Sequence, residues 1–387
     1  MKALFAHDHI FYHYNDKYYS TGGLSLEVLQ RYTRVFEDLT VLSRQKEMNK
    51  IDKKLTISSN DNIEFIKIDN INTFKNLRLY NRVNNTVKKQ VSKTDYVIAR
   101  IPSTIGSLAI KWAKKLKKPY LIEVVGCSWD AYKNHGRLIG KLIAPFAFLK
   151  QRFEVKNSLY TIYITKEFLQ KRYPTKNRSV VCPNVLIPRV DEEVIYRRKN
   201  KIGNMSENRE IVFGLIGSLE VDYKGHETAI RALAQIKGEI KKFRIEFLGK
   251  GNPEKWQKLA QELGVLDNIH FIGTLSSGEK VFDWLDSLDV QLQPSFAEAQ
   301  GRSIIEGMSR GCPIVASTVG GIVELIQNDF LVNAGDYQTL AKRILKILDK
   351  DRLLNQSEIN FYKSKEFYKD NIDEVRNKFL QEFKKGY

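Results

Sequence analysis

The chain has 387 residues, of which 42% are hydrophobic, and a formal net charge of +18. A length above the about 100–200 residues of one domain predicts two domains, and the hydrophobic content excludes a disordered chain. The longest apolar stretch, 138–149, contains Lys141 and is shorter than the ~20 residues that cross a bilayer. The N-terminal residues MKALFAHDHI lack the apolar stretch and cleavage site of a signal peptide, so we expect a cytoplasmic protein.

The first half of the chain alternates short apolar runs with amphipathic ones. Residues 24–36 carry apolar side chains at the spacing of one helix face, which predicts a helix there. The short apolar runs predict strands at 2–11, 39–44, 96–101, 120–125 and 160–165. Strands that alternate with helices form βαβ units, so a parallel sheet is expected.

The second half repeats this alternation after a polar, charged segment at 186–209, which predicts a linker or an irregular excursion. Amphipathic patterns predict helices at 225–236 and 337–350, and the charged tail 365–387 has one apolar helical face. Strands are expected at 211–218, 243–251, 268–274, 289–295 and 313–318.

This order of elements predicts an α/β protein with two Rossmann-like, doubly wound domains. Ligands of such sheets bind outside the carboxyl ends of the strands. Two of these domains placed face to face would enclose a cleft, and the glycine turns after the strands would line it. The expected boundaries are a first domain at 1–188, a linker at 189–208, a second domain at 209–364, and a C-terminal helix at 365–387 that packs back on the first domain.

The positive charge is concentrated in the first half. Residues 1–200 hold 37 Lys and Arg against 18 Asp and Glu, whereas residues 201–387 hold 26 against 27. An adaptation for solubility would not obviously segregate in this way, so one half is expected to meet an anionic partner. No pattern of an RNA- or DNA-binding motif is present, so nucleic acid is not an expected partner.

Cysteine and histidine give no sign of a metal or disulfide site. Cys127, Cys182 and Cys312 are far apart and form no CxxC pair, so each is expected to be a small buried residue. His7, His9 and His13 cluster near the first strand but lack metal-ligand spacing. We therefore expect no metal.

The segment PSFAEAQGRSIIEGMSRGCPIVAS, at 294–317, places two glutamates eight positions apart around a helix start. Gly301, Arg302 and Ser303 follow a strand and open a helix, whose N-terminus presents free N–H groups and a positive dipole end to a phosphate. Because carboxylates are repelled by phosphate, Glu298 and Glu306 are expected to bind sugar and ribose hydroxyls at the two ends of such a ligand.

Together with STVGGIVELI, which follows it, this segment resembles the signature of glycosyltransferase family 4, the retaining nucleotide-sugar transferases. The resemblance implies the GT-B fold, with acceptor bound mainly by the first domain and donor by the second. It implies that Glu298 lies by the transferred sugar, that Glu306 binds the ribose, and that the amides near Gly301 to Ser303 hold the diphosphate. It also implies metal independence.

Other segments resemble the same family. GLIGSLEVDYKGHETAIRAL, at 214–233, resembles the strand–loop–helix whose Lys-Gly meets the donor diphosphate, which implies donor contacts for Gly217, Ser218 and Lys224. FLGKG, with Gly249, and FIGTL resemble the loops that flank the base. CPNV, at 182–185, resembles the end of the first domain, and the loop with Gly22 and Gly23 resembles the one near donor phosphates and acceptor.

The sequence departs from the family pattern in two places. Ser218 stands where members usually carry an arginine, and Arg302 is a candidate for the missing cation. The loop VVGCSWD, at 124–130, has no histidine, and Asp130 or Trp129 is a candidate for its contacts. Plainer alternatives stay open: Lys224 as an ordinary surface lysine, Arg302 as a solvated helix start, and Asp130 as a helix cap.

A basic, apolar segment at 131–152 contains no Asp or Glu. Lys133, Arg137 and Lys141 are four apart and share a helix face, which is typical of an interfacial helix. A core helix with a solvated basic edge is the alternative. For contact with an anionic membrane surface we single out Lys111, Lys114, Lys115, Arg137 and Lys141.

These features predict a retaining, metal-independent hexosyltransferase with catalytic Glu298 and Lys224. A UDP-sugar is the first choice of donor, with no further cofactor, and the acceptor is a saccharide linked to polyprenyl diphosphate. The enzyme is expected peripherally on the inner face of the cell membrane, in the biosynthesis of capsule, exopolysaccharide or another surface polysaccharide. The alternative is a catalytically inactive GT-B partner of another transferase.

Overall fold

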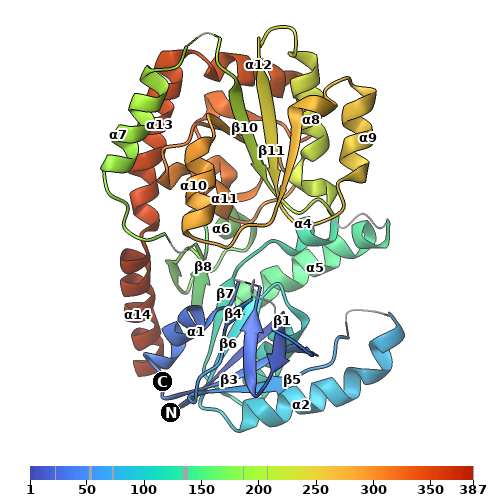
Figure 1. Ribbon diagram of the computed structural model, residues 1–387. Coiled ribbons are helices and arrows are strands. Elements are labelled where there is room, and N and C mark those ends of the chain that lie inside the picture. The colour runs from blue at the N-terminus through green and yellow to red at the C-terminus, as the bar shows by residue number, and fades with distance from the viewer. Residues whose placement is uncertain are drawn as a thin grey trace. The chain divides into compact units, whose positions relative to one another are not determined.

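A computed structural model describes residues 1–21, 23–51, 55–71, 74–133, 138–185, 187–206 and 208–386. The chain divides into two compact units (Figure 1). Unit 1 contains Met1–Pro183 and Ile372–Tyr387, and unit 2 contains Asn184–Asn371. Among the described residues no helix is long and apolar enough to span a membrane.

Unit 1 is built on a mainly parallel sheet. Its parallel strands lie in the order β5-β3-β1-β6-β7-β8-β9, and a short antiparallel extension, β2 and β4, is attached to the second half of β1. The strands are β1 Lys2–Tyr14, β2 Lys17–Ser20, β3 Asp38–Glu47, β4 Thr56–Ile57, β5 Ile63–Lys67, β6 Tyr96–Ile101, β7 Tyr120–Val124, β8 Tyr160–Tyr163 and β9 Arg178–Val181. Both β6 and β7 are buried along their whole length, as expected when helices cover both faces of a parallel sheet.

The helices of unit 1 include one from the far end of the chain. Residues 372–385 of α14 belong to unit 1, and the two chain ends lie side by side there (Figure 1). The Tyr96 hydroxyl donates to the Lys384 carbonyl over 3.0 Å, and Lys384 Nζ donates to the Val35 carbonyl. The helices are α1 Leu26–Thr33, α2 Tyr80–Ser92, α3 Thr104–Lys115, α4 Ser128–Lys133, α5 Leu138–Lys156, α6 Phe168–Arg172 and α14 Lys369–Lys385.

A buried charge network holds α14 to the sheet of unit 1. Arg376 Nη1 lies 2.7 Å from Glu123 Oε1, and both side chains are almost completely buried. The Tyr32 hydroxyl donates to the same carboxylate oxygen over 2.9 Å. Arg376 Nη2 also donates to the Cys182 carbonyl over 3.0 Å, so one guanidinium joins α14 to β7 and to the end of β9. Such a pair is stable only because each charge has a partner.

Unit 2 is a fully parallel six-stranded sheet in the order β12-β11-β10-β13-β14-β15. In strand order along the unit this is 3-2-1-4-5-6, the doubly wound arrangement, and its direction reverses between β10 and β13. The strands are β10 Ile211–Ile216, β11 Phe243–Leu248, β12 Ile269–Gly273, β13 Val290–Gln293, β14 Ile314–Ser317 and β15 Leu331–Val332. The fold class predicted from the sequence, two Rossmann-like units, is confirmed.

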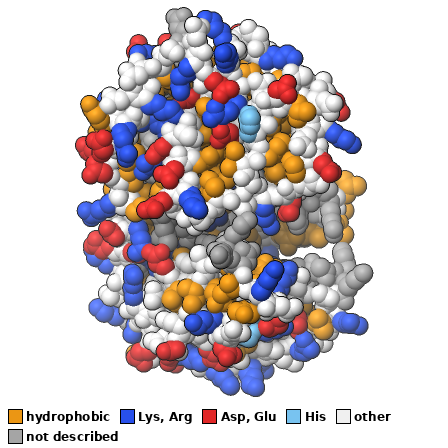
Figure 2. Space-filling model, in the orientation of Figure 1, with side chains coloured by type: hydrophobic (Ala, Val, Ile, Leu, Met, Phe, Trp, Pro, Cys, Tyr) orange, Lys and Arg blue, Asp and Glu red, His pale blue; other side chains and the backbone are white. Residues whose placement is uncertain are grey.

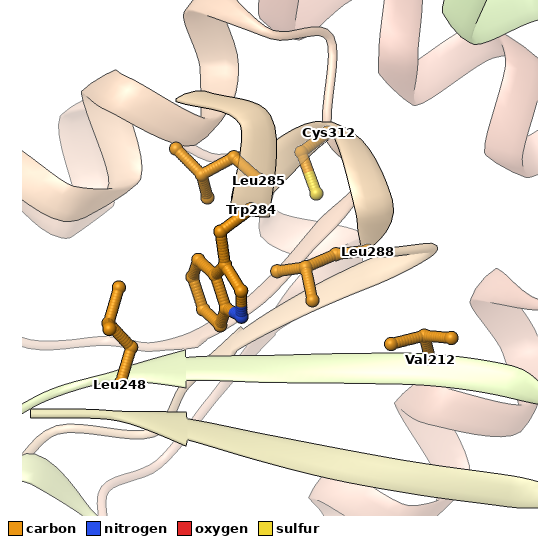
Figure 3. Packing of buried hydrophobic residues seen from close by; sticks show 6 residues of the cluster. All are labelled: Val212, Leu248, Trp284, Leu285, Leu288 and Cys312. Carbon is orange, nitrogen blue, oxygen red and sulfur yellow. The ribbon is translucent and has the colours of Figure 1, made fainter. Parts of the chain in front are cut away.

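Helices lie on both sides of this sheet, α8 and α9 on one side and α10 and α11 on the other (Figure 1). Between the α10–α11 layer and the strands, Trp284 belongs to a buried cluster with Val212, Leu248, Leu285, Leu288 and Cys312 (Figure 3). The indole Nε1 donates to Glu246 Oε2 over 2.7 Å, which satisfies its buried polar group. The helices are α7 Glu193–Gly203, α8 His226–Gln235, α9 Glu254–Glu262, α10 Glu279–Ser287, α11 Arg302–Ser309, α12 Tyr337–Ile347 and α13 Lys350–Ser364.

The predicted linker at 189–208 is wrong for most of its length. Residues Glu193–Gly203 form helix α7, which packs against α13 within unit 2. Its buried face consists of Val194, Ile195, Arg198 and Ile202. The Arg198 guanidinium donates to the carbonyls of Leu285 and Leu288, so a charged residue serves as a packing residue. The polar composition of this segment did not predict a packed helix, because its buried face has only three apolar side chains.

Unit 1 carries the whole excess of positive charge. Met1–Pro183 and Ile372–Tyr387 together hold 37 Lys and Arg against 18 Asp and Glu, and unit 2 holds 26 against 27. On the face that Figure 2 shows, Lys and Arg side chains are interspersed with Asp and Glu. No continuous basic area is visible there, so the excess is not gathered into one patch on that face.

Candidate functional site: the carboxyl edge of unit 2

Two loops of unit 2 leave the sheet where its strand order reverses. β10 ends at Ile216 and continues into the loop with Gly217, Ser218 and Lys224. Its neighbour β13 ends at Gln293 and continues into the loop with Glu298. Because parallel strands end at the same edge, both loops emerge together at the position where doubly wound sheets bind ligands.

The two residues predicted to be catalytic form a direct ion pair. Lys224 Nζ donates to Glu298 Oε1, across 74 residues of sequence. Both side chains are largely buried, with relative exposures of 21% and 13%. Lys224 is therefore not an ordinary surface lysine, and the plainer alternative for this residue is wrong.

Glycines allow these loops to approach one another more closely than other residues would. Gly225 has a φ of +83°, and a Cβ there would overlap the carbonyl oxygen of Pro294. A Cβ at Gly249, at the end of β11, would overlap the Gly217 carbonyl. The lysine loop and the glutamate loop are thus pressed together through backbone atoms.

The Gly-Gly turn after β14 supports Glu298 from the other side. Gly320 has a φ of +56°, and a Cβ there would occupy the position of the Glu298 carbonyl oxygen. The Gly321 N–H donates to the Ala299 carbonyl over 3.1 Å. The glycines at 320–321, which follow β14 directly in the turn, therefore fix the backbone of Glu298.

Helix α11 begins directly after this loop. Its N-cap Gly301 has a φ of +81°, and its carbonyl accepts from the N–H groups of Ile304 and Ile305. The N–H groups of Arg302 and Ser303, in the first turn, are the ones that a helix leaves for an anion. The Ser303 hydroxyl donates to Gln293 Oε1 over 3.1 Å, which ties the helix start to the end of β13. Arg302 is exposed.

Glu306 lies on the second turn of α11 and is mostly buried. Burial raises the pKa of its carboxyl group, and the nearby Arg302 opposes this effect in part. A carboxylate in such a position is suited to accept hydrogen bonds from hydroxyl groups, which replace the water that burial removed.

We expect the donor affinity to depend on pH through Glu306. Since its pKa is raised, this carboxyl becomes protonated at a higher pH than an exposed glutamate, and the neutral form is a weaker acceptor for ribose hydroxyls. The KM for the donor should therefore rise as the pH falls below neutrality. Glu306→Gln should show a high KM at every pH. A donor KM with the same pH profile in wild type and variant would contradict this role.

The serine that replaces the expected arginine makes only local contacts. The Ser218 hydroxyl donates to the Lys250 carbonyl over 3.2 Å, and Lys250 Nζ lies 3.8 Å from Glu220. Lys224 and Arg302 remain the candidate cations for the predicted diphosphate position.

His226 is a residue that the sequence interpretation missed. It follows Lys224 and Gly225 at the start of α8 and is fully buried. Its ring is stacked on Trp256 and meets Phe247 edge-on, with ring centroids 5.1 Å apart in both cases. Burial lowers the pKa of this imidazole to about 4, so it is neutral and serves as a packing residue between the two rings. Its position directly after Lys224 and Gly225 is the sequence feature that could have identified it.

The predicted residues of unit 1 lie apart from this constellation in sequence and in fold unit. Gly22 lies outside the described residues, and a Cβ on Gly23 would lie 3.8 Å from His9 Cε1. Asp130 lies in the first turn of α4 and its Oδ1 is 3.0 Å from Arg172 Nη1. Trp129 packs edge-on against Phe148. Within the described ranges, no group of three His, Cys, Asp or Glu side chains could hold a metal ion.

The lysines predicted to face a membrane lie on two helices of unit 1. Lys111 and Lys115 of α3 lie over the Trp112 ring, 5.5 and 5.3 Å from its centroid. Lys114 lies 5.4 Å from the ring centroid of Phe153, which belongs to α5. Lys141 is exposed on α5, and Arg137 lies outside the described residues.

The chain is similar in sequence to known proteins. The family model of glycosyl transferases group 1 matches residues 210–350. Protein CapJ of Staphylococcus aureus is 31% identical over 393 residues, which covers 100% of this chain and 96% of CapJ. The lipopolysaccharide glucosyltransferase WaaG of Escherichia coli (strain K12) is 29% identical over 192 residues, covering 46% of this chain and 49% of WaaG.

Solved structures show the same fold. The sucrose-phosphate synthase from Thermosynechococcus elongatus has a TM-score of 0.69 at 16% identity, with 100% of this chain and 99% of that chain covered. HepE of Anabaena, in complex with UDP and glucose, has a TM-score of 0.67 at 16% identity, with 100% of both chains covered. Two Rossmann-like units of this kind define the GT-B class of glycosyltransferases. By its sequence the chain belongs to the glycosyl transferases group 1 family.

Proposed function

We propose that this glycosyltransferase moves a sugar, with retention of configuration, from a nucleotide-diphosphate sugar to a saccharide acceptor. The observation that carries the proposal is the pairing of Lys224 with Glu298 where the strand order of unit 2 reverses. A cation and a carboxylate held side by side suit a donor that presents a diphosphate next to sugar hydroxyls.

In this proposal each group has a separate task. Lys224 and the N-terminus of α11 bind the diphosphate and stabilise the charge that develops on it as the sugar departs. Glu298 binds hydroxyls of the transferred sugar, and Glu306 binds the ribose. The donor's own phosphate oxygen takes the proton of the acceptor hydroxyl, so no further base and no metal are assigned.

Several observations support the choice of partners. HepE, which has the same fold, was solved with UDP and glucose, and UDP-sugars are our first choice of donor. WaaG is named for lipopolysaccharide, a cell-surface glycan. The charge excess of +19 on unit 1 suits an anionic acceptor, such as a saccharide linked to polyprenyl diphosphate at the inner leaflet. We therefore propose a role in cell-surface polysaccharide biosynthesis, such as capsule, and peripheral attachment to the membrane.

The proposal is tested with a panel of UDP-, GDP- and dTDP-sugars. We expect one of them to release its nucleotide slowly by hydrolysis and faster with a lipid-linked acceptor. Lys224→Ala should lower this release by about 10²–10³-fold, as removal of one transition-state donor does. Lys258→Ala, which removes an exposed lysine of the same unit, is the matched control.

Two other outcomes would be informative. Binding of a nucleotide sugar without release, even with acceptor, would favour an inactive GT-B partner, the alternative that Ser218 and the missing histidine suggest. Full activity in Lys224→Ala would remove the basis of the proposed mechanism.

A further inference from the structure

Helix α5 of unit 1 exposes a continuous apolar ridge. Large hydrophobic side chains follow one another at spacings of four, four, three and four residues, which places them on one helix face. Their exposures are 80% for Leu138, 72% for Leu142, 75% for Phe146, 61% for Leu149 and 66% for Phe153. Scattered exposed hydrophobics are ordinary, but a contiguous strip of this size marks an interaction surface.

The opposite face of α5 holds the helix to unit 1. Gly140, Ala144, Gln151 and Val155 are buried, and a Cβ on Gly140 would overlap the Tyr132 carbonyl of α4. Gln151 Nε2 donates to the Gly126 carbonyl over 2.9 Å. The helix is therefore anchored through its small and polar residues, and the ridge points away from the unit that supports it.

The charges of α5 are arranged around the ridge in a one-sided way. Its one carboxylate, Glu154, is buried, accepts from the Ser107 hydroxyl over 3.1 Å, and has a pKa raised by that burial. The exposed charged residues are all basic: Lys141, Lys150, Arg152 and Lys156. Lys114 of α3 adds a further cation at the Phe153 end. The ridge is thus bordered by bases and by no exposed acid of α5.

We propose that α5 is an interfacial helix whose apolar ridge inserts into the outer part of an anionic lipid leaflet. Phe146, Leu142 and Leu149 enter between the acyl chains, and the surrounding lysines and Arg152 contact lipid phosphates. A second copy of this chain is a poor occupant because two such basic borders would repel each other. This inference rests on the proposed membrane attachment. It adds that α5 is the helix that attaches and that it does so by inserting apolar side chains.

The insertion mode differs from purely electrostatic attachment in its response to salt. Attraction between exposed charges is largely screened when the Debye length shortens from ~8 Å at physiological ionic strength to ~3 Å at 1 M. Burial of apolar side chains is not screened in this way. Attachment through α5 should therefore survive salt that would release a protein held by lysines alone.

The test is co-sedimentation of the full-length protein with vesicles of phosphatidylcholine alone or with phosphatidylglycerol. We expect tighter binding to the anionic vesicles, and a loss of no more than about threefold between 0.15 and 1 M salt. The triple variant Leu142→Ser, Phe146→Ser, Leu149→Ser should bind at least about 30-fold more weakly. The control variant Tyr196→Ser removes a side chain of unit 2 that is 61% exposed and should bind as the wild type does.

A second measurement separates insertion from surface adhesion. Phe146→Trp should show a blue-shifted tryptophan emission with anionic vesicles, and Tyr196→Trp should not. Release of the wild type by 1 M salt, equal binding by the triple variant, or no blue shift would overturn the proposal. So would a dimer in vesicle-free solution that the triple variant converts to a monomer.

Nucleotide release without vesicles tells the two proposals apart. The triple variant should release nucleotide from the donor as fast as the wild type, because the predicted donor residues all belong to unit 2. If neither protein turns over any donor, the proposed transfer fails while the vesicle results still decide the role of α5.

Discussion

Glu298→Gln is expected to lower sugar transfer by about 10²–10³-fold while making UDP bind about tenfold more tightly. The loss follows because the carboxylate that we propose binds the transferred sugar is removed. The gain follows because Lys224 and Glu298 pair directly, so a diphosphate must compete with Glu298 for Lys224. With glutamine at 298 that competition is weaker, and the full charge of Lys224 is available to the phosphates.

Isothermal titration with UDP and a transfer assay with the donor measure the two effects separately. Glu220→Gln is the matched control, since Glu220 is an exposed carboxylate of the same unit whose Lys250 partner is 3.8 Å away. A variant that binds UDP more weakly than the wild type would contradict competition within the pair. Undiminished transfer would contradict the role of Glu298 at the sugar.

Tighter UDP binding together with slower transfer distinguishes a residue that acts on the substrate from one that only stabilises the loop. If Glu298 only stabilised the loop, its substitution would weaken UDP binding and transfer together. Lys224→Ala provides the other half of the comparison, because it should weaken UDP binding as well as transfer. The pair of variants therefore tests both partners of the same contact.

Arg376→Met is expected to destabilise unit 1 by about 3–5 kcal/mol, the cost of leaving a buried charge without its partner. Arg376 and Glu123 are 2% and 1% exposed, and without Arg376 the carboxylate would keep its hydrogen bond from Tyr32 and the more distant Arg100, 4.0 Å away. Methionine fills most of the volume of the arginine stem, so the effect reports the lost pairing rather than a cavity.

Urea unfolding, followed by a spectroscopic signal from unit 1, measures the change in the free energy of unfolding. Lys378→Met is the control. Lys378 lies on the same helix and is 70% exposed, so its substitution should change stability by less than about 0.5 kcal/mol. The double variant Arg376→Met, Glu123→Gln should recover part of the loss, because the buried carboxylate that lost its Arg376 partner is then neutral. Equal stability of Arg376→Met and wild type would show that α14 is held by its apolar face alone.

The fold class followed from the sequence because strands buried on both faces are locally distinctive. The run 96–101 was predicted as a strand and forms β6 with the same bounds, and all six of its residues are buried. Gly225 and Gly249, which the sequence placed in the predicted donor loops, lie where two backbones touch, and a Cβ at either would overlap a carbonyl oxygen. The family resemblance was confirmed by a full-length relative.

Other features required the tertiary structure because they depend on residues far apart in the chain. The segment 189–208 was predicted to be a linker, yet Glu193–Gly203 forms a helix. The few apolar side chains on its buried face are sufficient because they pack against α13. In residues 131–152, the sequence predicted that basic side chains would contact the membrane. The structure instead turns the apolar residues of α5 outward and buries its one carboxylate.

What the sequence determined by itself was therefore local: which runs are strands and helices, where glycine is required, and how charge is distributed along the chain. What the tertiary structure decided was which distant groups meet. Lys224 and Glu298 are 74 residues apart and Glu123 and Arg376 are 253 apart, so no local pattern could pair them. The same holds for exposure, because a helix with apolar side chains on every side does not reveal which of its faces the rest of the unit covers.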